Sequence, residues 1–172
     1  MKPGINNYSE IGKLNKVLLH RIGDEIEGLV PDNFERLLFD DIPYLKTAQE
    51  EHDRFADLLR ENGVEVIYYE EETAKALQDD KVRREFVKKF IADSDLYSEA
   101  VKEGLEEYLM SMPADQMVKK AISGVKKSDI IIKSNSLADY IDAGYPYHTD
   151  PLPNLYFTRD PGACVGDGIN IH

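Results

Sequence analysis

The chain has 172 residues, 42% of them hydrophobic and 31% charged, so it is long enough to bury one substantial core. Its net charge of -12 argues against nucleic acid and anionic membrane surfaces as partners, because both attract basic proteins. The chain has a single cysteine, no apolar stretch near the ~20 residues of a membrane span, and no signal-peptide pattern. These features together predict a cytoplasmic protein without an internal disulfide.

The first region, residues 1–70, shows strand and helix signals in alternation. Residues 17–19 form a short apolar run between polar neighbours, which is typical of a buried strand. A helix follows and is predicted to end at Asn62-Gly63; residues 64–69 are then β-branched and aromatic, as in a second strand. This order favours an α/β unit with two parallel strands. One face of the helix carries apolar side chains at spacings of three and four: Leu45, Ala48, His52, Phe55 and Leu59.

The second region, residues 71–133, predicts helices through most of its length. Apolar residues again recur every three or four positions, and Pro113 and Gly124 suit the start and the end of the last helix. We therefore expect about four short helices, inserted between strands of the α/β part. The acidic run at residues 70–72 is interpreted as a solvated helix start. The helical block is interpreted as a structural or oligomer-contact element.

The third region, residues 134–172, returns to strand and turn signals. Residues 129–133 just before it predict a short strand or a buried connection, and residues 134–150 predict a loop. Residues 155–157 are an apolar run fenced by prolines, which predicts a short buried strand. A hairpin is expected around residues 166–168. Because a natural domain rarely stops inside a hairpin, we expect the chain to be the N-terminal portion of a longer protein, truncated within this hairpin.

The predicted strand delivers Arg159 and Asp160 to its tip, where Pro161 ends strand pairing. A carboxylate at the end of a buried strand is costly unless it meets a cation. Two interpretations of Asp160 remain open: it pairs with an arginine of the protein, or it waits for a cationic ligand.

Residues 151–161, Pro-Leu-Pro-Asn-Leu-Tyr-Phe-Thr-Arg-Asp-Pro, resemble the substrate-binding segment of bacterial arginine deiminases, in the guanidino-group-modifying (pentein) superfamily. Residues 9–21 are similar to the opening strand of the same family, and residues 37–44 to its first substrate loop. Three long motifs in the family's order make the resemblance specific. It implies an α/β fold: the first blade of a five-bladed pseudo-symmetric β/α barrel (pentein propeller), interrupted by an inserted α-helical bundle.

The resemblance also implies a function, that of a hydrolase acting on the C–N bonds of linear amidines. L-arginine and water would give L-citrulline and ammonia through a covalent amidino-cysteine, without metal or organic cofactor. Asp160 is implied as a catalytic carboxylate, since two opposed carboxylates can hold the planar guanidinium bidentately. Asn154 and Phe157 are implied to contact the polar head and the apolar stem of the substrate. Leu38 is implied to contact it through its backbone.

The other half of such a site is absent from the sequence. The family's second carboxylate, its His-x-Asp element and its nucleophilic cysteine lie further along the chain, so we expect this chain to be inactive alone. His148-Thr149-Asp150 imitates His-x-Asp but precedes the substrate segment, and it is interpreted as part of a loop. Cys164 is interpreted as a buried, inert thiol, and His52 as a core histidine with satisfied hydrogen bonds.

Alternative functions remain open. One is another enzyme of the same superfamily, an amidinotransferase or a dimethylarginine hydrolase; another is a non-catalytic binding or assembly module. The inserted helices and the Phe-Thr-Arg-Asp-Pro motif favour the deiminase, with L-arginine as small-molecule partner and a homo-oligomeric assembly. Asp40-Asp41 is not expected to bind a metal, because adjacent acids point apart in an extended chain.

Overall fold

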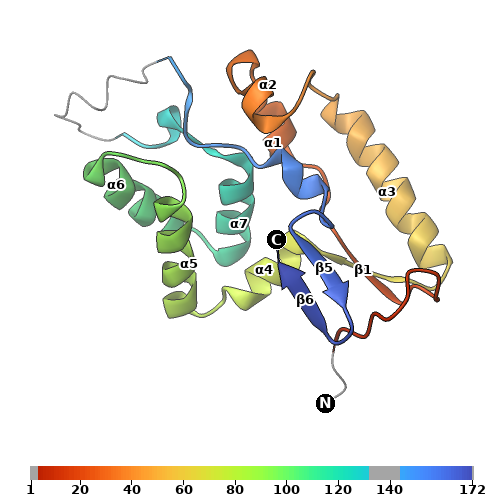
Figure 1. Cartoon of the computed structure of the whole chain (residues 1–172). Helices are drawn as coiled ribbons and strands as arrows, with labels where there is room; N and C mark the ends of the chain where they lie inside the picture. The colour runs from red at the N-terminus through yellow and green to blue at the C-terminus, as the bar shows by residue number, and fades with distance from the viewer. Residues whose placement is uncertain (1–3, 132–143, 172) are drawn as a thin grey trace.

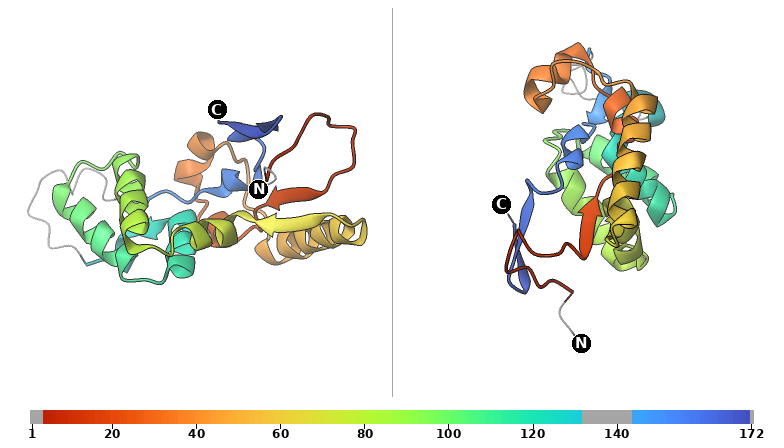
Figure 2. Two further views of the ribbon diagram at one scale, coloured as in Figure 1. Left: turned by 90° about the horizontal axis from the view of Figure 1, so that it is seen from below. Right: turned by 90° about the vertical axis from the view of Figure 1, so that its right-hand side faces the viewer.

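The computed structural model describes residues 4–131 and 144–171 (Figure 1). A block of helices lies at one end of the molecule, and the long helix α3 lies at the other, beside two strands (Figure 2). Within the described residues, no helix is long and apolar enough to cross a membrane. The first part of the chain contains β1 (Lys16–Leu19), α1 (Asp24–Glu27), α2 (Pro31–Leu37), α3 (Leu45–Glu61) and β2 (Glu65–Tyr68).

The strands β1 and β2 pair in parallel, with Val17 opposite Val66, as the sequence predicted. Helices α1, α2 and α3 lie in the connection between them, and α3 ends shortly before Gly63, whose φ of 76° confirms the predicted stop. The expectation that β1 is buried was wrong, because Leu18 is 38% exposed and the strand alternates between exposed and half-buried positions. A parallel pair needs cover on both faces, and two strands beside one long helix leave part of their surface open.

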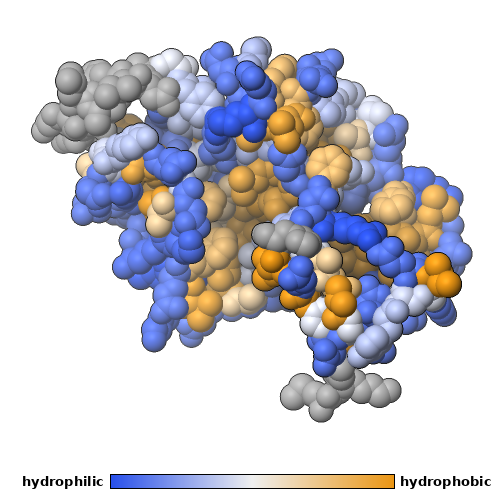
Figure 3. Space-filling model, in the orientation of Figure 1, coloured by the Kyte–Doolittle hydropathy of each residue, from blue (hydrophilic) through white to orange (hydrophobic). Residues whose placement is uncertain are grey.

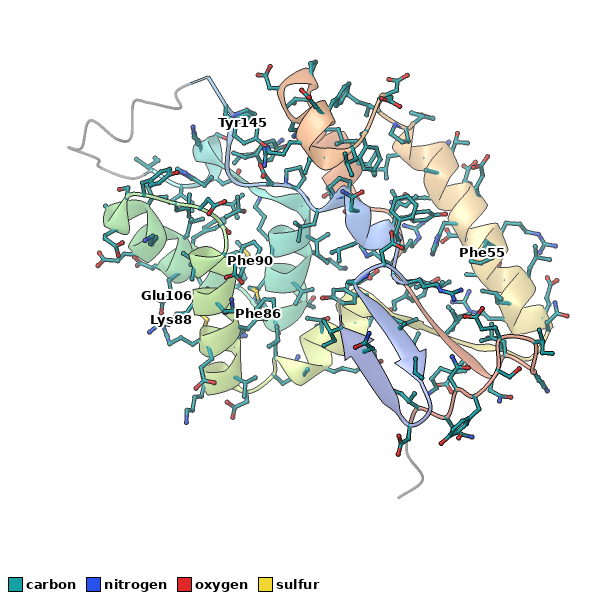
Figure 4. The ribbon with its side chains drawn as sticks, in the orientation of Figure 1. Phe55, Phe86, Lys88, Phe90, Glu106 and Tyr145 are labelled. Atoms are coloured by element: carbon teal, nitrogen blue, oxygen red, sulfur yellow. The ribbon has the colours of Figure 1, made fainter. Side chains whose placement is uncertain are left out.

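Four helices follow, in agreement with the prediction: α4 (Tyr69–Ala76), α5 (Asp80–Ala92), α6 (Glu99–Met110) and α7 (Ala114–Ser123). Their apolar faces meet in the main hydrophobic core, where Leu105, Leu109 and Met117 are fully buried. Phe86 and Phe90 pack against this core from α5 (Figure 4). The spacing of apolar residues that predicted the helices is therefore also the spacing that fills the core.

Two short strands lie after the helices. Strand β3 (Val125–Lys126) pairs antiparallel with β4 (Tyr147–Thr149). Of these two strands, β4 lies within residues 134–150, which were predicted to be a loop. The loop prediction was wrong for β4, because Tyr147 and Thr149 are buried and Thr149 Oγ1 accepts a hydrogen bond from the backbone N–H of Val125 at 3.0 Å. The loop was predicted from turn-forming residue types, and these do not reveal that alternate residues of β4 are buried.

Neither the short strand nor the buried connection expected at residues 129–133 is observed in the described part of this stretch: the short strand lies earlier, at β3, and Ile131 is 96% exposed. A 3-10 turn, η1 (Lys127–Asp129), follows β3, and Asp129 Oδ2 accepts a hydrogen bond from the backbone N–H of Lys126 at 3.0 Å. This side-chain bond to a backbone donor favours a turn over an extended chain. Residues 132–133 lie outside the described residues.

The segment predicted as a strand at residues 155–157 instead belongs to a 3-10 helix, η3 (Pro153–Tyr156), and the residue that follows it. Pro153 fixes φ at the first helical position, which favours a turn. The backbone N–H groups of Leu155 and Phe157 each donate to the carbonyl three residues earlier, at 3.1 and 3.0 Å. The strand prediction failed because these hydrogen bonds are local, whereas a strand needs a neighbouring strand.

The predicted hairpin is confirmed. Strands β5 (Gly162–Val165) and β6 (Gly168–Ile171) pair antiparallel around a two-residue turn, in which Gly166 has a φ of 63°. Asn7 and Gly166 exchange two backbone hydrogen bonds of 2.7 Å, which tie the hairpin to the start of the chain. The described residues form three two-stranded sheets and no closed barrel. A mixed architecture of helices and strands is therefore observed, and the five-bladed arrangement stays a prediction.

Candidate functional site

The segment of residues 151–161 runs between the helical block and the α/β part, and two hydrogen bonds fasten it at both ends. Near its start, the backbone N–H of Leu152 donates to the carbonyl of Ile122 at the end of α7, at 2.9 Å. Near its tip, the hydroxyl of Thr158 donates to the carbonyl of Leu18 in β1, at 3.1 Å. The segment is therefore held by elements far away in the sequence.

A third contact brings two of the predicted site residues into the same place. The side-chain amide of Asn154 donates to the carbonyl of Leu37 at 3.0 Å, directly before Leu38. Leu38 has a left-handed backbone, with φ 60° and ψ 38°, and its side chain is 85% exposed. For a residue with a Cβ this conformation costs about 1–2 kcal/mol, and such strain concentrates at functional sites. Asn154 and Leu38 thus lie together on a strained, solvent-facing turn.

The other two predicted residues lie further along the same segment. Phe157 is 49% exposed, and its carbonyl accepts a hydrogen bond from the backbone N–H of Asp160 at 3.0 Å, which closes a turn. Asp160 itself is exposed. Among the residues that the structure describes, no cation lies within ion-pair distance of its carboxylate; the neighbouring Arg159 pairs instead with Glu10. A carboxylate in this position is available to a cationic ligand.

An ion-pair cluster joins α2 to the strand that leads into this segment. Arg36 pairs with Asp150, its Nη2 donating to Oδ1 at 2.9 Å. The hydroxyl of Tyr145, a residue labelled in Figure 4, donates to the same carboxylate. Burial raises the pKa of Asp150, but the hydrogen bonds from Arg36 and Tyr145 and the charge of Arg36 together outweigh it and hold the pKa below its usual value. Asp150 is occupied by these partners, which supports a structural interpretation of His148-Thr149-Asp150.

A second charged cluster, which the sequence did not reveal, surrounds His20 at the end of β1. Its Nε2 lies 3.0 Å from Glu25 Oε1 and its Nδ1 lies 3.1 Å from Glu70 Oε2, with the imidazole 3% exposed. Burial lowers the pKa of His20, but the hydrogen bonds to both carboxylates outweigh it and raise the pKa to about 9. The ring is therefore charged at neutral pH and connects β1 to the starts of α1 and α4.

This cluster corrects the interpretation of residues 70–72 as a solvated run. Glu71 and Glu72 are exposed, but Glu70 turns inward to His20, and its side chain is only 16% exposed. Burial raises the pKa of Glu70, but the hydrogen bond from His20, backbone hydrogen bonds and the charge of His20 together outweigh it and lower the pKa below the usual value. The three acids look alike in the sequence, and only the position of His20 in space separates them.

Two predictions about single side chains were also wrong. Cys164 is exposed, because the β5–β6 hairpin faces solvent. His52 is buried as expected, but neither ring nitrogen has a hydrogen-bond partner among the described residues. Within those residues there is also no group of three or more side chains placed to hold a metal ion.

Comparison with known proteins agrees with the resemblance seen in the motifs. Residues 35–172 match the family model for arginine deiminase. The whole chain is 51% identical to an arginine deiminase of Limosilactobacillus reuteri, and 50% identical to one of Latilactobacillus sakei. Over 98% of its length it is 47% identical to an arginine deiminase of Streptococcus uberis. The chain therefore belongs to the arginine deiminase family; it spans 42% of the length of each of these relatives.

Proposed function

We propose that the chain supplies the guanidinium-binding part of an arginine deiminase, a hydrolase that converts L-arginine and water to L-citrulline and ammonia. The observation that carries the proposal is the exposed Asp160 carboxylate, without a cation partner among the described residues, on the segment that Asn154 fastens to the strained turn at Leu38. The family match and the names of the relatives support the choice of arginine.

The proposed roles follow from the shape and charge of arginine. Its guanidinium is planar, always charged, and presents a fork of N–H donors that a carboxylate such as Asp160 can accept bidentately. The half-exposed ring of Phe157 offers an apolar surface to the aliphatic stem. Asn154 and the backbone of Leu38 offer polar contacts to the amino-acid head. These groups bind and orient the substrate, and they need no metal or organic cofactor.

The chemical step needs a thiolate that this site does not supply. The thiolate adds to the guanidinium carbon, ammonia leaves with a proton from an acid, and water then hydrolyses the amidino-cysteine to citrulline. Cys164 is the only cysteine of the chain and lies on the exposed hairpin. We propose that the nucleophile, its histidine and the second carboxylate belong to the rest of a longer protein, and that the 172-residue chain is inactive alone.

We further propose a homo-oligomeric, cytoplasmic protein in which residues 1–70 and 134–172 belong to the α/β barrel and residues 71–133 form the insert. Exposed apolar side chains on both arms of the hairpin support association with further protein: Val165 is 68% exposed, and Ile171 is 80% exposed. Within the described residues, β5 and β6 pair only with each other, so their outer edges can recruit other strands. A module that only binds or assembles would use the same surfaces.

The proposal is tested by replacing Asp160 with Asn in a longer protein that contains this chain and produces citrulline. The change is nearly isosteric but removes one charge of the guanidinium clamp, so kcat/KM for arginine is expected to fall by about 10²–10³ with Tm unchanged. Asp167→Asn, in the hairpin turn, is the matched control and is expected to leave kcat/KM unchanged. A variant of Asp160 that loses Tm but keeps kcat/KM would contradict the proposal and favour a structural ion pair.

A further inference from the structure

His52 of α3 lies in a cage of aromatic rings contributed by three different elements. Its ring centroid is 6.5 Å from that of Phe55 on the same helix, 6.1 Å from that of Tyr68 in β2 and 6.1 Å from that of Tyr156 in η3. The His52 side chain is 5% exposed, and neither nitrogen has a hydrogen-bond partner among the described residues. The imidazole therefore acts here as an apolar ring, in edge contact with Phe55 and Tyr156 and tilted against Tyr68.

This cage touches the proposed arginine site through one further ring contact. Tyr156 packs edge-to-face on Phe157, with centroids 5.4 Å apart. Phe157 in turn accepts the backbone hydrogen bond that closes the turn to Asp160. An unbroken series of contacts thus runs from the buried face of α3 to the residues proposed to hold arginine. Phe55, which is labelled on α3 in Figure 4, is 49% exposed and forms the solvent side of the cage.

The charges around the cage make protonation of His52 unfavourable. Burial lowers the pKa of His52, and the neighbouring cations Arg21 and His20 lower it further; Asp53 and Glu70 act in the opposite direction. Both acids are already engaged, since Asp53 pairs with Arg21 at 2.7 Å and Glu70 with His20 at 3.1 Å. A protonated His52 would therefore be a buried cation beside two others.

The guanidinium of Arg60 adds a further cation, 5.8 Å from the centre of the Tyr68 ring. Near pH 5 to 7 the other facing groups keep their charge: the pKa of His20 is about 9, and the pKa values of Asp53 and Glu70 are lowered. His52 is thus the member of this cluster that is left to gain a proton as the pH falls below the ordinary histidine range.

We propose that neutral His52 is a positioning residue for arginine binding. Its ring holds Tyr156 in place, and Tyr156 in turn holds the segment that carries Phe157 and Asp160. Protonation of His52 releases that segment. The inference rests on the proposed function and adds a control of the same site by acid. Release allows the imidazolium to reach water, so the seated segment and the protonated ring exclude each other. Linkage is reciprocal, so arginine must also disfavour the proton on His52.

The test uses the 172-residue chain and NMR titration of its histidine rings from about pH 7.5 to about pH 5, with and without saturating L-arginine. The wild-type arginine Kd is expected to rise on acidification, by at most about tenfold per pH unit for a single proton. Arginine is expected to lower the His52 pKa and to leave that of His148 unchanged. The amide shifts of residues 154–160 should follow the His52 titration even without arginine.

Two variants separate the ring from its proton. His52→Phe keeps an aromatic ring in the cage and is expected to bind arginine within about tenfold of wild type at about pH 7.5, with no pH dependence below it. His52→Ala empties the cage and is expected to weaken binding at every pH. His148→Gln is the control and should keep the wild-type pH profile.

Several outcomes would overturn the inference. One is a His52→Phe protein whose arginine Kd depends on pH as in the wild type. Another is a His52 pKa that does not change when arginine binds. A third is a set of amide shifts of residues 154–160 that do not change as His52 titrates. If arginine binds at no pH while the amide shifts still follow His52, the control of arginine binding by His52 is contradicted and only its hold on the segment stands. The proposed function fails by a different result, an Asp160→Asn change that leaves kcat/KM of the longer protein unchanged. The two failures are therefore distinguishable.

Discussion

The helical block and the α/β part of this protein bury their apolar residues to very different extents. In the block, helices α4 to α7 enclose a core in which Val87, Leu105 and Met117 have no exposed surface. In the α/β part, apolar side chains of α3 stay partly in solvent, as Phe55 at 49% and Leu58 at 43% exposure show. Apolar surface is visible between the block and the hairpin, and again beside α3 (Figure 3).

The uncovered surface of the α/β part includes a hollow of about 410 Å³ where α3 ends. Its lining is mostly apolar side chains from the start of the chain, α3 and the turn into β2: Lys13, Leu14, Phe55, Leu58, Leu59, Asn62 and Val64. The contrast has a physical origin. Helices that are neighbours in the sequence can close a core among themselves, whereas a parallel sheet of two strands needs further layers to cover it.

The largest expected effect is a cavity in the helical core. Leu105→Ala removes a fully buried side chain, so we expect the free energy of unfolding to fall by about 2–5 kcal/mol. Leu58→Ala, the matched change on α3, removes a side chain that is 43% exposed and should cost less than about 1 kcal/mol. Urea unfolding monitored by circular dichroism measures both. Equal losses in the free energy of unfolding would contradict the difference in burial between the helical block and the α/β part.

The second effect concerns Gly124, the residue that joins the helical block to β3. Its φ is 79°, and an added Cβ would meet the backbone N of Pro151 at 2.7 Å and the carbonyl oxygen of Thr149 at 2.8 Å. We expect Gly124→Ala to cost about 2–4 kcal/mol, from strain and from the displaced neighbouring strand. Gly63→Ala is the control: its φ is 76° but a Cβ meets nothing within 4 Å, so the cost should be about 1 kcal/mol.

Thermal melts of the two glycine variants measure this difference. A larger loss of Tm for Gly124→Ala would show that the chain packs tightly where α7 ends and β3 begins. If Gly63→Ala were the more destabilising change, the close approach of Pro151 and Thr149 to Gly124 would not hold in solution.

The third effect is a pH dependence that originates in the α/β part. His20 has a folded-state pKa of about 9, against an ordinary value of 6.5, so the folded protein binds this proton more tightly than the unfolded chain. The stabilisation is fully present below about pH 6.5 and is lost as pH rises through about 9. The loss is at most about 3–4 kcal/mol, since the pKa is raised from 6.5 to about 9 and each pKa unit corresponds to 1.36 kcal/mol.

Urea midpoints from about pH 6 to about pH 10 measure this loss, and NMR titration of His20 gives its pKa directly. Glu70→Gln keeps a hydrogen-bond acceptor but removes one of the two charges that raise the pKa of His20, so it should move the loss to lower pH. Stability that does not change between neutral and alkaline pH would show that His20 is neutral in the folded protein.

Sequence periodicity predicted α3 and the helices α5 to α7 because their backbone bonds and much of their packing are local. It failed for η3, where prolines around an apolar run suit a turn as well as a strand, and only a partner strand decides. It also failed for contacts between distant positions. Arg36 and Asp150 are 114 residues apart, and no pattern in the sequence relates them.

The candidate site shows the same limit. Asp160, Asn154 and Phe157 were named from a motif within one short segment, and Leu38 from another motif. Their spatial relation depends on the bond between Asn154 and the carbonyl of Leu37, across 117 positions. The left-handed backbone of Leu38 could not be predicted, because leucine rarely adopts it and the surrounding contacts impose it.

The smallest expected effect is at Cys164, which tests how open the hairpin side of the molecule is. The thiol is exposed, so Cys164→Ser should change the free energy of unfolding by no more than about 0.5 kcal/mol. For the same reason, a maleimide reagent should label the wild-type chain as fast in buffer as in urea. Labelling that is slow in buffer and fast in urea would mean that another surface covers the hairpin in solution. Dilution then separates the sources, because cover by a second copy of the chain disappears at low protein concentration, whereas cover from within the chain does not.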